Sequence, residues 1–367
     1  MSRILGAPRR LGALALLAAL LGLVGTAQAE PYLAVRTGLK CVACHVNPSG
    51  GGLRNAVGNA FAQSVIPAND MPAALSGWNG ALGSHLRIGG DVRWASTDTA
   101  VDGQATSKVN ATEQARLYAD LQILADKLGV YVDETVGPKV PQREEAYVRA
   151  SLPDMSWYAK FGQFYLPFGW RLQDNTAFVR QVSGISMTVP DKGIEIGMER
   201  PDWSAQLDYT NGPGNVGGFT GHQLTGQLIW LQSWGRLGAS TAQVTSTGGA
   251  RQAYGLFGGT TTGPLAWLAE IDYVGDDGYP EGRRRFMATL LEANWLIWKG
   301  HNLKLTSEYY DPDLRVANDQ QDRYSLIYEY TPFAFLQVRA GLRIYKGIPQ
   351  NKFDNRQLSF IELHGLF

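Results

Sequence analysis

The chain has 367 residues, and its 33 lysines and arginines balance 33 aspartates and glutamates, so its formal net charge at pH 7 is zero. This balance excludes a large basic surface and, with it, nucleic acid as a partner. Glycine is abundant, at 43 residues, and aromatic residues make up 11% of the chain, a composition that favours a β-rich protein.

A leader precedes the rest of the chain. Three arginines lie within the first ten residues, an apolar run follows from 11 to 24, and Ala27-Gln28-Ala29 closes the segment. This order predicts a cleaved secretory signal peptide at 1–29, because the apolar run is shorter than the roughly 20 residues that a membrane-spanning helix needs. Its removal leaves 30 basic against 33 acidic residues and carries both cysteines into an oxidising compartment.

The only two cysteines stand in the run Cys41-Val42-Ala43-Cys44-His45. Two cysteines separated by two residues and followed by histidine form the attachment motif for haem c, in which the thiols bind the porphyrin and the histidine ligates the iron. A zinc site needs more ligands, and the next histidine is His85. A redox dithiol is usually followed by a helix, whereas a glycine run follows here. The motif predicts one covalent haem c, with a structural disulfide as the alternative.

Residues 30–79 form a small segment around this motif. Residues 53–62 are compatible with a short helix that covers one face of the haem, and Pro67, Pro72 and Gly77 mark a linker after it. About 50 residues are too few to enclose a haem alone, since chains this small rarely build a sufficient core. The segment therefore needs a second surface to pack against.

From residue 80 to 367 the dominant hydrophobic period is two. Near 264–274, for example, apolar residues alternate with polar ones, and turn clusters at 211–214 and 276–280 separate such runs. About 16 runs of this kind can be counted, the first near 82–95 and the last near 355–367. A soluble β-sandwich would show the same alternation.

Three features favour a membrane barrel over a sandwich. Many runs span nine to eleven residues, the length of a tilted membrane-crossing strand. Aromatic residues such as Trp203 and Tyr209 stand at the ends of apolar faces, where interfacial girdles are expected. The alternating end of the chain, 361–367, closes on Phe367 and resembles the porin C-terminus. The sequence therefore predicts an all-β, about 16-stranded antiparallel barrel at 80–367, embedded in outer-membrane lipid and enclosing an aqueous lumen.

The expected lumen face carries both signs of charge. A local match at 161–169, followed by Asp174-Asn175, resembles the phosphate-selective porin group, in which a long loop after this strand folds into the pore. A phosphate pore should show a run of lysine and arginine, and none is present. Carboxylates could hold ferrous iron, although lumen lining explains them better. The residues on the expected lumen phase are Arg116, Arg149, Lys160, Arg339 and Arg343, with Asp120, Asp208, Glu270, Asp272, Glu292 and Glu362.

The haem motif, Thr37-Gly38-Leu39-Lys40 before it and a barrel after it resemble the fused cytochrome–porin family of the outer membrane, whose members include iron oxidases. The chain is compact for that family. The resemblance implies a haem segment at the periplasmic side or inside the lumen. It also implies transfer of single electrons between an extracellular donor or acceptor, with Fe²⁺ the leading candidate, and a periplasmic c-type cytochrome or other carrier.

The second axial ligand of the iron has three candidates. Met71 lies in the linker, where its apolar character alone would explain it. His85 and His364 fall on the expected lumen phase of the first and last strands, which must be neighbours if the barrel closes. Both should then face the lumen near the same rim. Methionine would raise the haem potential and a second histidine would lower it.

Two other functions fit the same pattern. The chain could be a diffusion porin for anions or small solutes in which the haem segment only gates or senses. It could also be the porin sheath of a larger conduit, with a separate multihaem protein inside. No serine nucleophile elbow, phosphate-binding glycine loop or His-Glu-x-x-His motif is present, so hydrolytic chemistry is not indicated.

Overall fold

The computed structural model describes residues 30–71, 78–138, 142–185, 189–212 and 221–367. The predicted signal peptide at 1–29, and Pro72 and Gly77 of the predicted linker, therefore lie outside the described residues. In the ranges just given, no helix combines the length and the apolar character needed to cross a membrane.

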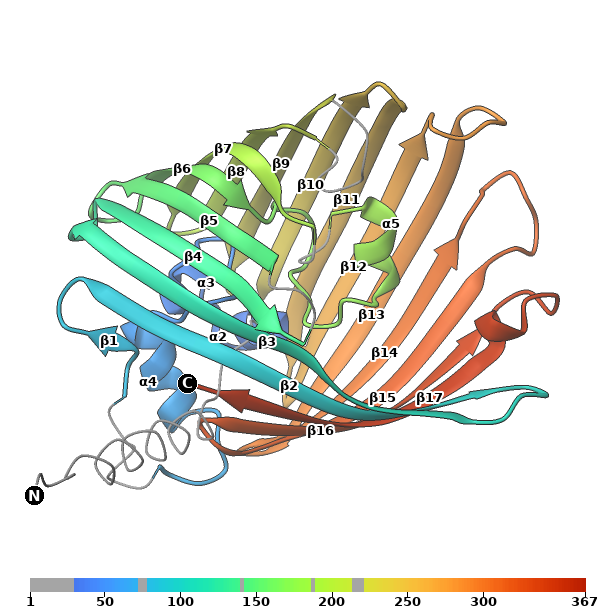
Figure 1. Cartoon of the computed structure of the whole chain (residues 1–367), viewed down its shortest axis with the longest axis horizontal. Coiled ribbons are helices and arrows are strands. Elements are labelled where there is room, and N and C mark those ends of the chain that lie inside the picture. Colours follow the sequence, from blue (N-terminus) through green and yellow to red (C-terminus); the bar gives the residue numbers. More distant parts are fainter. Residues whose placement is uncertain (1–29, 72–77, 139–141, 186–188, 213–220) are drawn as a thin grey trace, which may run out of the picture.

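The described strands form one closed antiparallel barrel (Figure 1). Each strand from β2 to β16 pairs with the next in the chain, and β17 pairs with β2, which closes the cylinder. A short extra strand, β1 (Ala81–Leu82), pairs with the start of β2. The sixteen barrel strands are β2 (Leu86–Val101), β3 (Ser107–Leu124), β4 (Leu128–Gly137), β5 (Gln142–Ser151), β6 (Trp157–Phe164), β7 (Asp191–Arg200), β8 (Trp203–Thr210), β9 (Gly221–Gln232), β10 (Gly235–Ser246), β11 (Gly249–Thr262), β12 (Leu265–Asp276), β13 (Arg284–Trp298), β14 (His301–Asp311), β15 (Gln321–Phe333), β16 (Leu336–Lys346) and β17 (Arg356–Leu366).

The alternation predicted from the sequence places apolar side chains outside and polar ones inside. In β8, Leu207 and Tyr209 are 54% and 55% exposed, whereas Asp208 between them is fully buried. A soluble protein would bury the leucine and expose the aspartate. The reverse arrangement is that of a barrel whose outer face meets lipid and whose lumen is polar. This confirms the predicted all-β membrane-barrel fold class.

The two rims of the barrel differ. Connections such as those between β7 and β8 or β9 and β10 are two residues long, and β2 begins and β17 ends at this short-turn rim. Longer segments, such as the nine residues between β14 and β15, lie at the opposite, long-loop rim. Five exposed tryptophans lie near the short-turn rim and three exposed tyrosines lie toward the long-loop rim, as in interfacial girdles. They are Trp157, Trp230, Trp234, Trp295 and Trp298, with Tyr209, Tyr254 and Tyr324.

Four α-helices of the described residues lie inside this cylinder or at one of its rims (Figure 1). Residues 30–71, here called the plug, carry α2 (Pro31–Thr37), α3 (Cys41–Cys44) and α4 (Ala56–Ser64) at the short-turn rim. The segment between β6 and β7, here called the inner loop, carries α5 (Phe178–Ser183) and turns back into the barrel. A single-turn 3-10 helix, Lys352–Asn355, lies between β16 and β17.

The apolar core lies within the lumen and joins these inserts to the wall. The larger cluster packs Tyr32 of the plug and Phe178 of the inner loop with Phe257 and Leu268 of the wall. The smaller cluster packs plug residues 46 and 53 against tyrosines of β3, β4 and β5. The second surface that the sequence demanded for residues 30–79 is therefore the inner wall of the barrel.

The first strand begins later than the sequence predicts. The alternating pattern starts near residue 82, but β2 runs from Leu86 to Val101. His85 lies before it, in an exposed turn, where its Nδ1 is 2.9 Å from the carbonyl oxygen of Gln122. The prediction that His85 faces the lumen from a strand is wrong. The alternation of apolar and polar residues begins before the turn at Gly83 and Ser84 and continues through it into β2, so the sequence does not show where the strand begins.

Candidate functional site

The two cysteines of the sequence motif lie on one helical turn. α3 runs from Cys41 to Cys44, and residues three apart on a helix share a face. Both cysteines are free. Burial raises the pKa of both thiols, the opposite of what a redox-active dithiol needs. The local geometry thus presents two thiols on one helical turn, and their raised pKa values argue against thiol–disulfide exchange. Covalent haem and a structural disulfide both stay predictions.

The loop after the helix returns the chain to the same place. His45 and Arg54 pair as an antiparallel bridge, and the amide of Val46 donates to the carbonyl of Leu53 at 3.0 Å. The segment from 45 to 54, here called the hairpin, turns through the glycines at 50–52. His45 is buried, and its Nδ1 has no hydrogen-bond partner among the described residues.

Cys41, Cys44 and His45 line one cavity, here called the Cys–His cavity. The plug supplies one side of it, and the inner loop and β9, β10 and β11 supply the rest. Its large apolar side chains are Leu33, Phe61, Ile66, Trp170, Ile229 and Phe257, and its arginines are Arg54, Arg171 and Arg236.

These residues fit a covalently attached haem c. Burial, helped by the nearby guanidinium groups of Arg54 and Arg171, lowers the pKa of His45 to about 3, so its imidazole is neutral, the form that ligates metals. Apolar side chains suit a porphyrin face, and the arginines suit carboxylate substituents. Cys41 and Cys44 would hold the group covalently, and His45 would be its proximal iron ligand.

The plug is held in the barrel by buried polar contacts. Asn47 donates to both carboxylate oxygens of Glu145 at 3.1 Å and accepts from Lys160 at 2.9 Å. Lys160 also lies 2.7 Å from Glu195, and all four side chains are fully buried. Because buried charges are costly unless paired, this network fixes the hairpin to β5, β6 and β7.

The opposite side of the plug is tied down by a second ion-pair network. Lys304 of β14 lies 2.9 Å from Glu30 of the plug and 3.1 Å from Glu329 of β15. At the short-turn rim, Lys40 pairs with Glu199 at 2.9 Å. The end of the plug is fastened where the amide of Ala68 donates to the carbonyl of Thr331 at 2.8 Å. The plug thus has contacts around the circumference of the barrel.

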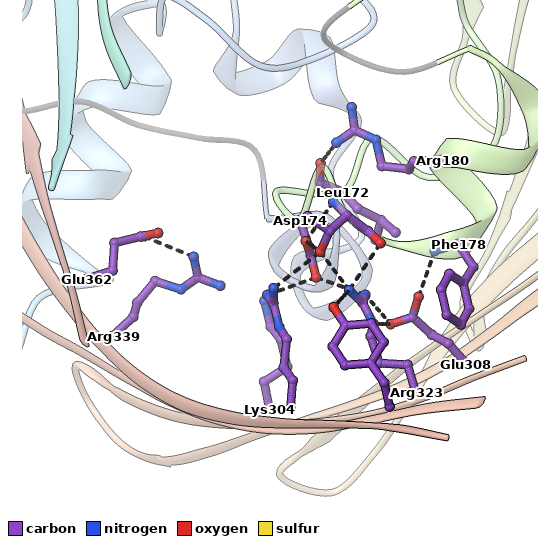
Figure 2. Close-up of polar contacts among 12 residues, drawn as sticks. Leu172, Asp174, Phe178, Arg180, Lys304, Glu308, Arg323, Arg339 and Glu362 are labelled. Atoms are coloured by element: carbon purple, nitrogen blue, oxygen red, sulfur yellow. Dashed lines mark hydrogen bonds and ion pairs between the residues drawn. The ribbon is translucent and has the colours of Figure 1, made fainter. Parts of the chain in front are cut away.

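The inner loop crosses the lumen above the plug. Its Trp170 amide donates to Glu270 of β12 at 2.9 Å. Figure 2 shows the second contact, in which the Phe178 amide donates to Glu308 of β14 at 2.8 Å. Asp174 lies 2.9 Å from Arg323 and 2.9 Å from Arg343. Although burial opposes it, these two guanidinium groups hold the pKa of Asp174 well below its usual range.

The fold of this chain is similar to that of known outer-membrane porins and channels. No protein-family model and no curated protein matches the chain. Among solved structures, an anion-selective porin from Comamonas acidovorans aligns with a TM-score of 0.61 and 10% identity, over 77% of this chain and 99% of that chain. OmpT of Vibrio cholerae aligns with a TM-score of 0.58 and 11% identity, over 78% and 99%. The outer-membrane channel DcaP of Acinetobacter baumannii aligns with a TM-score of 0.53 and 15% identity, over 77% and 97%.

The chain has the outer-membrane porin fold. Identities this low show the fold alone. The sequence resemblances implied two features for this barrel: a long loop that folds into the pore and a haem-binding segment. The long loop after β6 does turn into the pore, as the local match at 161–169 predicts. These comparisons do not test the cytochrome motif, which stays a prediction.

The porin fold places most of the predicted lumen residues as expected. Ten of the eleven side chains assigned to the lumen phase are buried inside the barrel; Arg343 is partly exposed and pairs with Asp174 of the inner loop. Glu270 and Asp272 lie together on β12, but within the described residues no group of three or more metal-ligating side chains gathers. Glu270 instead accepts from the Trp170 amide.

The three candidates for the second axial ligand are placed apart. His364 is 1% exposed and faces the lumen, as predicted, in a cavity of about 450 Å³. That cavity adjoins the Cys–His cavity and shares with it the lining residues Glu30, Leu33, Arg54 and Ile66. Met71 is partly exposed, two residues after Asn69, whose main-chain amide donates to the carbonyl of Pro332 near the end of β15. Neither Met71 nor His85 lines the Cys–His cavity.

Sequence reasoning missed the arginines and the tryptophan of the cavity. Arg171 and Trp170 directly follow the matched segment 161–169, so the local match could have suggested them. Arg236 lies at the start of β10, and its guanidinium donates to the carbonyl of Leu39 at 2.9 Å. No local pattern marks Arg236 or Arg54, because their place depends on strand register and on how the plug docks.

Proposed function

We propose that this porin-fold protein carries one covalent haem c in its plug and passes single electrons across the outer membrane. The leading external donor is Fe²⁺, and the internal partner is a periplasmic c-type cytochrome or other electron carrier. The observation that carries the proposal is that Cys41, Cys44 and His45 line one cavity between the plug and the barrel. A bound haem c supplies one-electron redox chemistry.

The position of the cavity suits such a relay. In outer-membrane barrels the short turns face the periplasm, so the plug lies on the periplasmic side. Val42 and Ala43, between the two cysteines, line an open groove at the short-turn rim with residues of the turns at 154–156 and 199–201. A periplasmic carrier could approach the motif there. The apolar core of the bilayer is about 30 Å thick, so an external donor must enter the lumen from the long-loop side.

The decisive test is covalent haem. The mature chain, expressed with a cytochrome c maturation system, should give a haem c spectrum after denaturation, and Cys41→Ala/Cys44→Ala should give none. Heat-modifiable migration in gels provides the control that the variant barrel has folded. A wild-type protein that folds but binds no haem under these conditions would remove the proposal.

Electron transfer needs a separate measurement. Protein reconstituted in vesicles that enclose an oxidised soluble cytochrome c should reduce it when Fe²⁺ is added outside, and the double cysteine variant should not. The midpoint potential sets the direction of flow. A strongly negative potential would contradict iron oxidation and favour electron export, because Fe²⁺ could not then reduce the haem.

A second candidate function is a diffusion porin for anions or small solutes. The observation that favours it is the shared fold with porins, one of which is anion-selective. Planar-bilayer conductance discriminates the two. A steady open pore with a haem that external donors do not reduce supports the diffusion porin, whereas low conductance with a reducible haem supports the electron relay.

A further inference from the structure

Arg54 stands out among the cations at the Cys–His cavity. It closes the hairpin opposite His45 and lines both the Cys–His cavity and the adjoining cavity that contains His364. Its side chain is partly buried. Among the described residues, its guanidinium group has no hydrogen-bond or ion-pair partner, although five N–H donors are available on it.

The other charged groups of the cavity wall are engaged. Arg236 donates to main-chain carbonyls of the plug, including that of Leu39. Arg171 lies 3.5 Å from Glu145. Lys40 is paired with Glu199. Glu30, the one carboxylate among the lining residues, lies 2.9 Å from Lys304. The charge of Arg54 is thus left without a counter-charge.

An unpaired cation in such a place is unfavourable. Partial removal of a guanidinium from water is unfavourable unless an anion compensates it, and burial accordingly lowers the pKa of Arg54 to about 10. The planar fork of arginine matches a carboxylate with two parallel hydrogen bonds. The expected compensating group is therefore a carboxylate held in the cavity.

We propose that Arg54 forms an ion pair with a propionate carboxylate of a haem held by Cys41, Cys44 and His45. This inference rests on the proposed function, since it concerns the same cofactor. The two propionates are the only charged substituents of haem, and its attachment motif and Arg54 line the same cavity. In this role Arg54 neutralises a buried propionate and places a positive charge beside the redox centre.

The charge has a measurable consequence. A nearby cation favours the reduced haem, because reduction removes one positive charge from the iron. Removing the cation should therefore lower the midpoint potential. It should also raise the pKa of the propionate, so that proton uptake on reduction, and a pH-dependent potential, enter the range of pH 5 to 8.

The experiment compares Arg54→Leu, Arg54→Gln and Arg54→Lys in the full mature protein, with Arg36→Leu as the matched control. Arg36 is also a plug arginine, but its guanidinium donates to Pro264 at the rim and does not line the cavity. Haem content and midpoint potential are measured for each. We expect about a tenfold shift of the reduction equilibrium toward the oxidised form in Arg54→Leu and Arg54→Gln, or about 59 mV for one electron. Arg54→Lys should keep most of the wild-type potential.

The outcomes separate this inference from the proposed function. A wild-type protein without haem would remove the proposed function. A wild-type haem whose potential shifts no more in Arg54→Leu and Arg54→Gln than in Arg36→Leu would overturn the ion pair alone. A free anion as the partner of Arg54 would also overturn it, and would show as a wild-type potential that changes with added phosphate or acetate at constant ionic strength. If Arg54→Leu loses haem, Arg54→Gln and Arg54→Lys still provide the comparison.

Discussion

At the scale of single residues, Gly58 shows how tightly the plug is built. Asn55 caps α4 by accepting from the Gly58 amide at 2.9 Å, and its own amide donates to the carbonyl of Cys44 at 3.0 Å. A Cβ added at Gly58 would lie 2.0 Å from that same carbonyl oxygen. The obstacle is main chain and cannot move aside as a flexible side chain could. Glycine therefore lets α4 pack directly on the cysteine helix.

We expect Gly58→Ala to separate α4 from α3 and to destabilise the docked plug by about 1–3 kcal/mol, the usual cost of overpacking. The readout is the rate at which a protease cleaves the plug in the folded barrel, which should rise. Val57→Ala, at an exposed position on the same helix, is the matched control and should leave the rate unchanged. Equal rates for both variants would show that the close packing is not needed.

Asn47 lies at the centre of the contacts that hold the hairpin. Its side chain bridges Glu145 and Lys160, donating to one and accepting from the other. Asn47→Asp keeps the shape but turns the donor toward Glu145 into an acceptor, so two carboxylates would face each other. We expect a cost of about 1–3 kcal/mol for the unsatisfied buried group. Protease cleavage of the plug should accelerate. Asn59→Asp is the control and should be cleaved like wild type, because the side chain of Asn59 makes only an exposed hydrogen bond, to the carbonyl of residue 79.

Single residues could be predicted where their chemistry is local. Cys41, Cys44 and His45 are adjacent in sequence and meet in one cavity for that reason. Asn47 and Arg54, only a few residues further on, gave no signal, because their roles depend on which strands the hairpin faces. The strand alternation placed His364 correctly on the lumen face. The same alternation extends through the turn before β2, so it wrongly placed His85 on a strand.

At the scale of elements, the inner loop is fixed at several points along its length. Asp174 makes two of these contacts, because it forms ion pairs with both Arg323 and Arg343. Asp174→Asn would leave two guanidinium groups without their shared anion. We expect the loop to become mobile and the bilayer conductance to become larger and noisier than in wild type. Asp154→Asn, in an exposed turn at the other rim, is the control; identical traces for the two variants would contradict the anchoring role.

The same anchor has a pH dependence. The pKa of Asp174 is held well below the ordinary aspartate value of 3.8, so the docked state binds fewer protons than the released state near that pH. Its contribution is therefore present above about pH 4 and is lost only as pH falls through the lower, docked-state pKa. We expect conductance to stay constant from pH 7 to pH 4. A transition centred near pH 4 would mean that Asp174 titrates as a free carboxyl.

Elements were the most predictable level of this structure. Strand period, strand length and turn clusters are local patterns, so about 16 strands could be counted from the sequence. The error fell at the start of β2, where Gly83 and Ser84 make a turn without breaking the alternation. The inner loop was predicted by its local match, but the residues that hold it, Glu270, Glu308 and Arg323, lie far away in sequence and required the register of β12, β14 and β15.

At the scale of the whole molecule, the plug and the barrel complete one another. The plug is too small to line the Cys–His cavity alone. Its acidic and polar side chains in turn pair with charged side chains on the inner wall of the barrel. Lys304 lies between Glu30 of the plug and Glu329 of the wall. Size alone implies that residues 30–79 need a second surface, and the sequence could predict that the barrel provides it at its periplasmic side or inside its lumen. The ion pair between Lys304 and Glu30 could not be predicted, because it joins residues 274 positions apart.

This mutual dependence predicts how the pore behaves when the plug is loosened. Lys304→Gln leaves the buried carboxylate of Glu30 without its ion-pair partner, whereas Glu329 keeps Arg339 at 3.4 Å. Removal of one partner of a buried ion pair costs about 3–5 kcal/mol. We expect the plug to leave its docked position more often, and single channels in planar bilayers to open several times more often than those of wild type.

Lys299→Gln is the matched control for that measurement. Lys299 is also a lysine at the plug, 3.8 Å from Asp70, but both side chains are exposed, and such surface pairs contribute little. Its channels should resemble those of wild type. If Lys304→Gln channels also stay closed, the inner loop rather than the plug blocks the lumen, and the conductance of Asp174→Asn then becomes the measurement that tests which of the two inserts closes the barrel.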